Sequence, residues 1–338
     1  MKKYFLYELK KHLWTLIILT AACAIPYIVN MATSTMWYEY EDWETGVLQK
    51  VIQAPSLSFV YGALLILLFV VPMLMYSFKM SKRGVDGYYS LPLKKEKLYF
   101  VLTMVGLILV IVPYTVAYWS GFLALLFREG NPYQMEYFVP AYFVGVLFAV
   151  FLYGINAFLF TRANRTSDGV IFMLAYAIVG YLFICLIDSF LPPGEYIPYG
   201  IEASFFFSGG MFEYASKICM AITGGVADYE YAGWWFGLPI GAGIVSYALF
   251  FYLLRFEKAE NAEQTSESWF GYRALIPVYM ALSLGGGMGT DPLGIILIVL
   301  AALIATMVHK HTFRLKWKDL LPLACGLVVG LVLMIFTL

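Results

Sequence analysis

The residues best placed to do chemistry lie in a polar stretch at 77–98, between two long apolar runs. The stretch carries six basic residues, and Val85, Tyr88, Tyr89 and Leu91 recur at roughly helical spacing until Pro92, which does not continue a helix. This pattern predicts a short amphipathic helix that docks into a groove on a soluble partner. The alternative is a basic loop that meets only anionic lipid. The candidate docking residues are Lys82, Arg83, Asp86, Tyr88, Tyr89, Leu91 and Pro92.

Motifs for other kinds of chemistry are missing from the sequence. Without a G-x-x-x-x-G-K-[ST] motif, the chain is not expected to cradle nucleotide phosphates itself, so we expect no ATPase activity in this polypeptide. Neither H-E-x-x-H nor G-x-S-x-G occurs, and the four cysteines form no C-x-x-C pair, so no metal or cofactor is expected. His309 and His311 flank Lys310 and are interpreted as part of an interfacial basic cluster.

The composition indicates a membrane protein. Of 338 residues, 62% are hydrophobic and 13% are charged, and the mean hydropathy is +0.77. A soluble domain is about half apolar and about a quarter charged, so this chain would have too little polar surface to cover a soluble core. No basic surface interleaved with aromatic residues suggests nucleic acid as a partner, whereas membrane lipid is an expected one.

The apolar runs predict an all-α, polytopic transmembrane helical bundle. A helix needs about 20 apolar residues to cross the hydrocarbon core of a bilayer. A further apolar run at 274–308 is interrupted by Gly285-Gly286-Gly287 and Asp291-Pro292, and we interpret it as a hairpin of two short helices. With that hairpin the chain has about nine spans. The other seven are 13–30, 57–76, 100–127, 138–160, 169–191, 234–254 and 320–338.

The distribution of charge predicts the orientation of the chain. Of the 22 basic residues, 19 fall in the five segments 1–12, 77–99, 161–168, 255–273 and 309–319, and 13 of the 22 acidic residues fall elsewhere. Basic residues accumulate on the cytoplasmic side of a membrane. We therefore expect the amino terminus in the cytoplasm and the carboxyl terminus outside, and a hairpin at 274–308 is required to keep the last basic segment inside.

Four parts of the chain are predicted. A cytoplasmic amphipathic segment at 1–12 puts Tyr4, Phe5, Leu6 and Leu9 on one face, or else acts only as a positive anchor. A six-helix core follows at 13–254. Its external region at 192–233 forms either interfacial helices over a translocation path or an ordinary outer loop. A cytoplasmic linker at 255–273 leads to a membrane extension at 274–338.

The polar stretch resembles the first cytoplasmic loop of bacterial ABC-2 type exporter permeases. The resemblance is carried by Lys82-Arg83, Asp86, Tyr89-Ser90-Leu91-Pro92 and the basic cluster Lys94-Lys95-Glu96-Lys97. It covers residues 77–98 in sequence and about 1–255 in layout. The spans after residue 273 depart from the six-helix layout and resemble a carboxyl-terminal extension found in some relatives.

The resemblance implies a function and partners. In that family the loop forms a coupling helix that seats in a separate ATP-binding cassette subunit, and two permease chains pair around the path, as a homodimer or heterodimer. We therefore expect the permease subunit of an ATP-driven exporter in a bacterial plasma membrane. The alternatives are a secondary transporter, which would need a polar group at mid-membrane, and a non-transport membrane protein such as a sensor or assembly partner.

Overall fold

The computed structural model is largely helical. It describes residues 2–34, 37–41, 48–52, 57–129, 135–188, 190, 237–256, 259–264, 266, 268, 270–285, 292–310, 312 and 314–337. The long helices are α2 (Leu13–Thr33), α3 (Leu57–Tyr76), α5 (Lys95–Leu126), α6 (Met135–Thr161), α7 (Thr166–Asp188), α10 (Gly237–Leu253), α12 (Pro292–Lys310) and α13 (Trp317–Thr337). The shorter ones are α1 (Lys2–Lys11), α4 (Lys82–Tyr89), α11 (Tyr272–Gly285) and the 3₁₀ turns η1 (Ser77–Met80), η3 (Leu254–Phe256) and η4 (Ala259–Asn261).

The described helices support the prediction of a polytopic membrane bundle. Seven of them are long and apolar enough to span a bilayer, namely α2, α3, α5, α6, α7, α12 and α13. The predicted sixth span is α10, with 17 residues, and the first half of the predicted hairpin is α11, with 14 residues. Both are therefore short for a crossing. The separate helices α11 and α12 occupy the run at 274–308, as expected for a hairpin.

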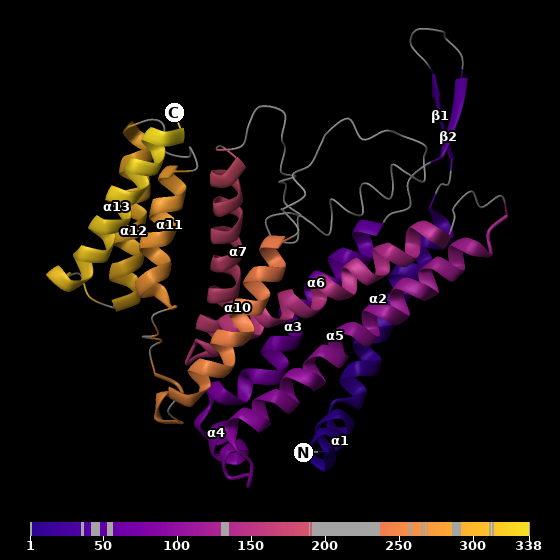
Figure 1. The fold of residues 1–338 in the computed structure, drawn as a ribbon, viewed down its shortest axis with the longest axis horizontal. Coiled ribbons are helices and arrows are strands. Elements are labelled where there is room, and N and C mark those ends of the chain that lie inside the picture. The colour runs from indigo at the N-terminus through magenta and orange to yellow at the C-terminus, as the bar shows by residue number, and fades with distance from the viewer. Residues whose placement is uncertain are drawn as a thin grey trace.

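The helices form one large group and one small group (Figure 1). In the large group α2 lies along α5, and α3 packs against α5 and α6, while α7 and α10 pack against α6. The small group consists of α11, α12 and α13, and α11 also packs on α7. The amino terminus lies at the lower end of the view and the carboxyl terminus at the upper end. The external region predicted at 192–233 lies outside the described residues.

One described element was not expected from the sequence. The strands β1 (Trp37–Glu41) and β2 (Leu48–Ile52) form an antiparallel pair in which Trp37 lies opposite Ile52 and Glu41 opposite Leu48. The hairpin follows α2 and projects beyond the helices, at the end of the molecule away from the amino terminus (Figure 1). The all-α prediction therefore holds for the helical bundle but not for this connection.

The core of the large group is unusually rich in tyrosine, and glycines let the rings approach neighbouring helices. A Cβ at Gly145 of α6 would lie 2.1 Å from the Tyr114 hydroxyl, and one at Gly154 would lie 2.5 Å from the Tyr247 ring. Tyr247 donates a 2.8 Å hydrogen bond to the carbonyl of Val150. Without side chains at these glycines, tyrosine hydroxyls reach backbone carbonyls on α6, which satisfies their polar atoms away from water.

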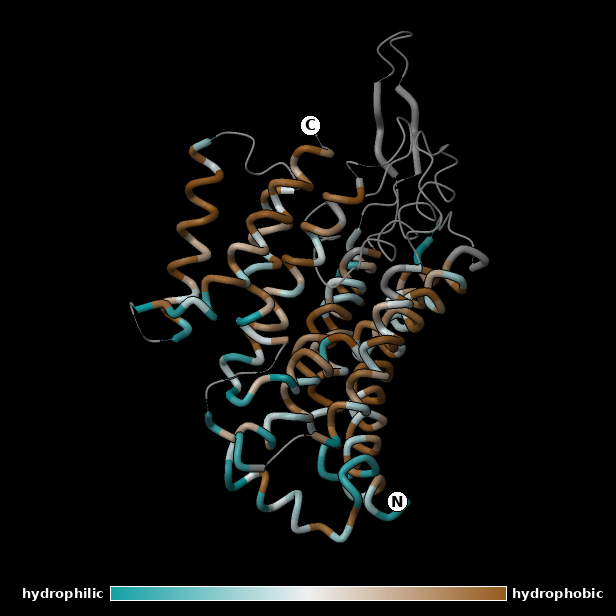
Figure 2. Tube along the Cα trace, turned by 60° about the vertical axis from the view of Figure 1, so that its left-hand side comes forward, coloured by the Kyte–Doolittle hydropathy of each residue, from teal (hydrophilic) through white to brown (hydrophobic). Residues whose placement is uncertain are grey.

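Four of the five predicted basic segments, 1–12, 77–99, 161–168 and 255–273, are linked to one another at one end of the molecule. Segment 77–99 contacts segment 1–12 through Lys11 and Tyr88, and it contacts segment 255–273 through Lys82 and Glu263. Segment 161–168 joins them because Arg165 donates to the Glu263 carbonyl. Figure 2 shows many of the hydrophilic residues gathered at this lower end, with apolar residues along the helices above it.

Candidate docking site

The predicted amphipathic helix of the loop is α4, which covers Lys82–Tyr89. Its start is fixed by Ser81, whose hydroxyl accepts a 3.1 Å hydrogen bond from the Gly84 amide, as expected of an N-cap residue. Its end lies just before the Leu91-Pro92 pair, where the proline ring disfavours helical geometry in the preceding residue. The predicted stop at Pro92 is therefore placed three residues beyond the last helical residue.

The apolar face of α4 lies against the chain itself. Val85 is 3% exposed, and the Tyr88 ring stacks on Phe78 with ring centroids 4.1 Å apart. The hydroxyl of Tyr89 shares a 3.1 Å hydrogen bond with that of Tyr99, a buried residue near the start of α5. Leu91 is partly buried against the same core. These residues hold α4 in place, so a partner would not meet them as a free apolar surface.

The opposite face of α4 is open to a partner. Lys82, Arg83, Asp86 and Gly87 are all exposed, and so is Pro92 beyond the helix. This face carries two basic groups and one acidic group within two turns. The structure therefore divides the seven predicted docking residues into an inner set of Tyr88, Tyr89 and Leu91 and an outer set of Lys82, Arg83, Asp86 and Pro92. A complementary partner surface would be charged rather than apolar.

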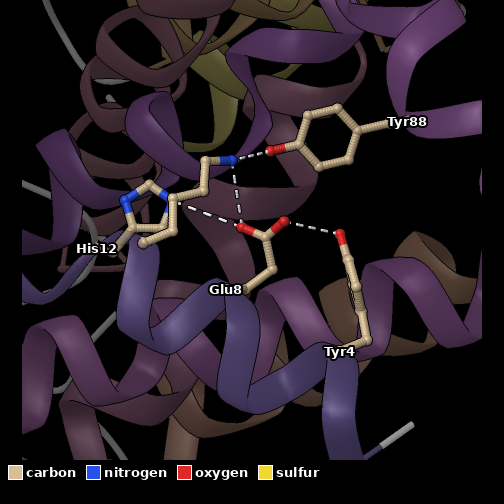
Figure 3. A network of polar contacts seen from close by, with 5 residues as sticks. Tyr4, Glu8, His12 and Tyr88 are labelled. Carbon is tan, nitrogen blue, oxygen red and sulfur yellow. Dashed lines mark hydrogen bonds and ion pairs between the residues drawn. The ribbon is translucent and has the colours of Figure 1, made fainter.

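Beside α4, α1 contacts it through a polar network centred on Glu8 (Figure 3). Glu8 is only 2% exposed, although it belongs to a surface helix. Its carboxylate accepts 2.9 Å and 3.3 Å hydrogen bonds from Tyr4 and Lys11, and His12 Nε2 lies 3.8 Å away. Lys11 also donates a 2.6 Å hydrogen bond to the Tyr88 hydroxyl. A buried carboxylate needs such partners, since burying it alone would be costly.

The pKa values of Lys11 and His12 are shifted in opposite directions. Burial alone would lower the pKa of Lys11, but the hydrogen bond with Tyr88 and the charge of Glu8 raise it overall. For His12, burial and the nearby Lys11 charge lower the pKa below its usual value of 6.5, against the opposing effect of Glu8. Lys11 is therefore charged and His12 is neutral at pH 7. Of these two side chains, only Lys11 contacts Glu8 as a cation.

The predicted amphipathic character of α1 agrees only in part with its packing. Tyr4, Phe5 and Leu9 are partly buried against the core, whereas Leu6 is 52% exposed. The position between Phe5 and Leu9 on the inner face is taken by Glu8. Its role could have been suspected from the spacing, because Tyr4, Glu8 and His12 are four residues apart and share one helix face.

On its other side α4 is held by the linker that follows α10. The Lys82 amide donates a 3.2 Å hydrogen bond to the Glu263 carboxylate. Glu263 has a φ of 68°, in the left-handed region, and its amide and carbonyl bond to Asn164 and Arg165, at 3.1 Å and 3.0 Å. The left-handed region is unfavourable for a non-glycine residue, so Glu263 keeps this conformation only because hydrogen bonds such as these hold its backbone. No local sequence pattern predicts this contact between residues 181 positions apart.

The inner face of α4 is continuous with the membrane helices. The Tyr99 ring lies 5.9 Å from Phe78 of η1, on which Tyr88 of α4 stacks, and 6.0 Å from Tyr76 at the end of α3. Phe250 of α10 meets both Tyr76 and Tyr99 edge-on. Aromatic pairs of this kind add about 0.5–1.5 kcal/mol each beyond their burial. A displacement of α4 would therefore disturb the packing at the ends of α3, α5 and α10.

Comparisons with known proteins identify no relative. No protein-family model, no curated protein and no solved structure matches the chain. In the part of the chain that the structure describes, there is also no cluster of three or more histidine, cysteine or acidic side chains able to hold a metal ion. The function therefore has to be inferred from the geometry around α4 and from the sequence.

Proposed function

We propose that the chain is the membrane-spanning permease subunit of an ATP-driven exporter, energised by a separate ATP-binding cassette subunit that docks on the outer face of α4. The observation that carries the proposal is the division of α4. Its outer face presents Arg83 and Asp86 to solvent. Tyr88 and Tyr89 fix its inner face to α1 and α5, and the Lys82 amide at its start bonds the linker. A helix held in this way can transmit a movement of a soluble partner to the membrane helices.

The proposal includes an orientation and an assembly. Nine crossings, with α10 and α11 as the two short ones, put the basic end in the cytoplasm of a bacterial plasma membrane. A second permease chain, identical or different, would complete the translocation path. In support, exposed apolar residues such as Ile17, Ile18 and Ile25 line α2, and these face lipid or the second chain.

The docking face is tested by reversing its charge. In the full-length chain, the double substitution Arg83→Glu and Asp86→Lys is compared with Arg314→Glu, an exposed basic residue at the same end but outside α4. ATP hydrolysis that co-purifies with the wild-type chain should fall severalfold with the double variant and persist with the control. The proposal fails if no ATP hydrolysis co-purifies, or if the double variant retains all of it.

Two further measurements distinguish the alternatives. In a cysteine-free background, Asp86→Cys should react with a membrane-impermeant maleimide only from the cytoplasmic side, and labelling from outside would overturn the orientation. Once a cargo is known, its transport should stop on ATP depletion. Transport that continued without ATP but collapsed with the proton gradient would identify a secondary transporter instead.

A further inference from the structure

A cavity of about 330 Å³ lies between α11, α12 and α13 at their basic end. Its polar side is formed by Arg273, Lys310, Lys316 and Lys318, and its apolar side includes Ile276 and Leu323. The volume is within the range of sites that bind small molecules. None of these residues belongs to the candidate docking site on α4.

The charge of the cavity is strongly positive. Four cationic side chains line it against one carboxylate, Asp319, which gives a formal net charge of +3 before His309 is counted. The carboxylate is already engaged, because it accepts hydrogen bonds from the Lys310 ammonium and the Lys316 amide. The excess positive charge of the cavity suits an anion of more than one negative oxygen, such as a phosphate group.

A second cavity lies next to the first, in the apolar part of the three-helix group. It measures about 200 Å³ and shares Leu323 with the basic cavity. Its lining is apolar and includes Met280, Ala302, Ala324 and Leu327 from the same three helices. The basic cavity and the apolar cavity match the two parts of a phospholipid. The headgroup would lie in the basic cavity at the membrane surface, and the acyl chain would lie in the apolar cavity below it.

The packing of the three helices explains why the cavities stay open. Gly326 and Gly330 form a G-x-x-x-G pair on α13 that brings it close to α11. A Cβ at Gly326 would lie 2.7 Å from the Pro277 carbonyl, and one at Gly330 would lie 2.9 Å from the Leu284 side chain. This contact fixes the distance between α11 and α13, while the side of the group near α12 is less tightly filled.

We propose that this pair of cavities is a binding site for one anionic phospholipid. Its phosphate lies among Arg273, Lys310, Lys316 and Lys318, and one acyl chain follows the apolar cavity past Leu323. The lipid joins α12 to the contact of α11 with α13. This site is separate from the exporter proposal, because it depends only on the chain being a membrane protein.

The site is tested by binding of lipid to the detergent-purified full-length chain, followed by native mass spectrometry. Dioleoyl phosphatidylglycerol is compared with dioleoyl phosphatidylcholine, and inorganic phosphate is added as a competitor. Arg273→Gln and Lys318→Gln remove charge from the cavity, whereas Arg314→Gln removes a charge between α12 and α13 from a residue that does not line it. Ala324→Phe fills the apolar cavity and leaves the charges in place.

The expected result is selective binding of phosphatidylglycerol, weakened about fivefold by each charge substitution in the cavity and unchanged by Arg314→Gln. Ala324→Phe should also weaken binding, although the chain elutes as the wild type does in size-exclusion chromatography. Equal binding of phosphatidylcholine overturns the proposal, as does an equal loss with Arg314→Gln. Displacement of the lipid by millimolar phosphate would show a free-anion site and also overturn it.

Discussion

Lys11 at the end of α1 donates a 2.6 Å hydrogen bond to the hydroxyl of Tyr88 on α4, across 77 positions of sequence. The Lys11 ammonium also lies 5.1 Å from the centre of the Tyr88 ring. The Tyr88 ring in turn stacks on Phe78, which connects the loop helix to α3. The Lys11 side chain therefore connects α1 to α4, the helix that we propose as the docking element.

Tyr88→Phe tests this contact. The change removes the hydroxyl that accepts from Lys11 and keeps the ring stacked on Phe78, so it should cost about 1 kcal/mol in unfolding free energy. Tyr88→Ala should cost more, since the stacking is lost as well. Hydrogen–deuterium exchange in lipid nanodiscs should show faster exchange in α1 for Tyr88→Phe, and unchanged exchange there would contradict the contact.

Glu8→Gln tests the polar network between α1 and α4. The substitution removes the charge that Lys11 balances in a buried position, so it should destabilise the fold by about 1–3 kcal/mol. The matched control is Glu96→Gln, which breaks a 3.0 Å bridge to Arg255 with side chains 49% and 65% exposed. An exposed pair of this kind contributes about 0–1 kcal/mol. Thermal unfolding in detergent should separate the two variants, and equal melting temperatures would contradict the central role of Glu8.

The lowered pKa of His12 should make the folded chain less stable in mild acid. Its pKa in the folded chain is lowered by burial and by Lys11, with Glu8 opposing, from a usual value of 6.5. Between the lowered value and 6.5 the unfolded chain binds more protons than the folded chain, so the unfolding free energy falls as the pH falls through this window. The melting temperature should drop from pH 7.5 to pH 5.5, and His12→Gln should make that drop smaller. An identical drop in the variant would exclude His12 as its source.

Gly145→Ala tests the packing of tyrosines on α6. The new Cβ would lie 2.1 Å from the Tyr114 hydroxyl, so we expect overpacking to cost about 1–3 kcal/mol. Gly62→Ala on α3 is the control, because nothing lies within 4 Å of a Cβ there, and alanine favours a helix more than glycine does. The control should melt at the wild-type temperature or above it. If Tyr114→Phe partly restores the melting temperature of Gly145→Ala, the clash is located at that hydroxyl.

The sequence predicted the membrane helices well because their signal is local. A run of about 20 apolar residues has no stable place in water, whatever it packs against. The structure accordingly has α2, α3, α5, α6 and α7 near the predicted positions, although α5 begins five residues earlier than predicted, at Lys95. The break between α11 and α12 was also predictable, since glycines and Asp291-Pro292 interrupt the apolar run.

The candidate site was predictable only in part. The amphipathic pattern of α4, its basic residues and its end before Pro92 could be recognised from the sequence. The link between the Glu8 network and α4 could not be recognised in the same way, because Lys11 and Tyr88 are 77 positions apart. The contact between Lys82 and Glu263 joins two loops 181 positions apart, and no local pattern encodes it.

The sequence alone therefore determined that this chain forms several helices long and apolar enough to span a membrane, and it predicts that the basic loops between them lie on one side. Hydropathy and charge act on each segment separately, so they can be read without knowing the fold. Only the tertiary structure decided which face of α4 is covered and which is free. A helical pattern identifies an apolar face, but whether that face meets its own chain or another depends on the neighbouring helices, and here Phe78 and Tyr99 cover it.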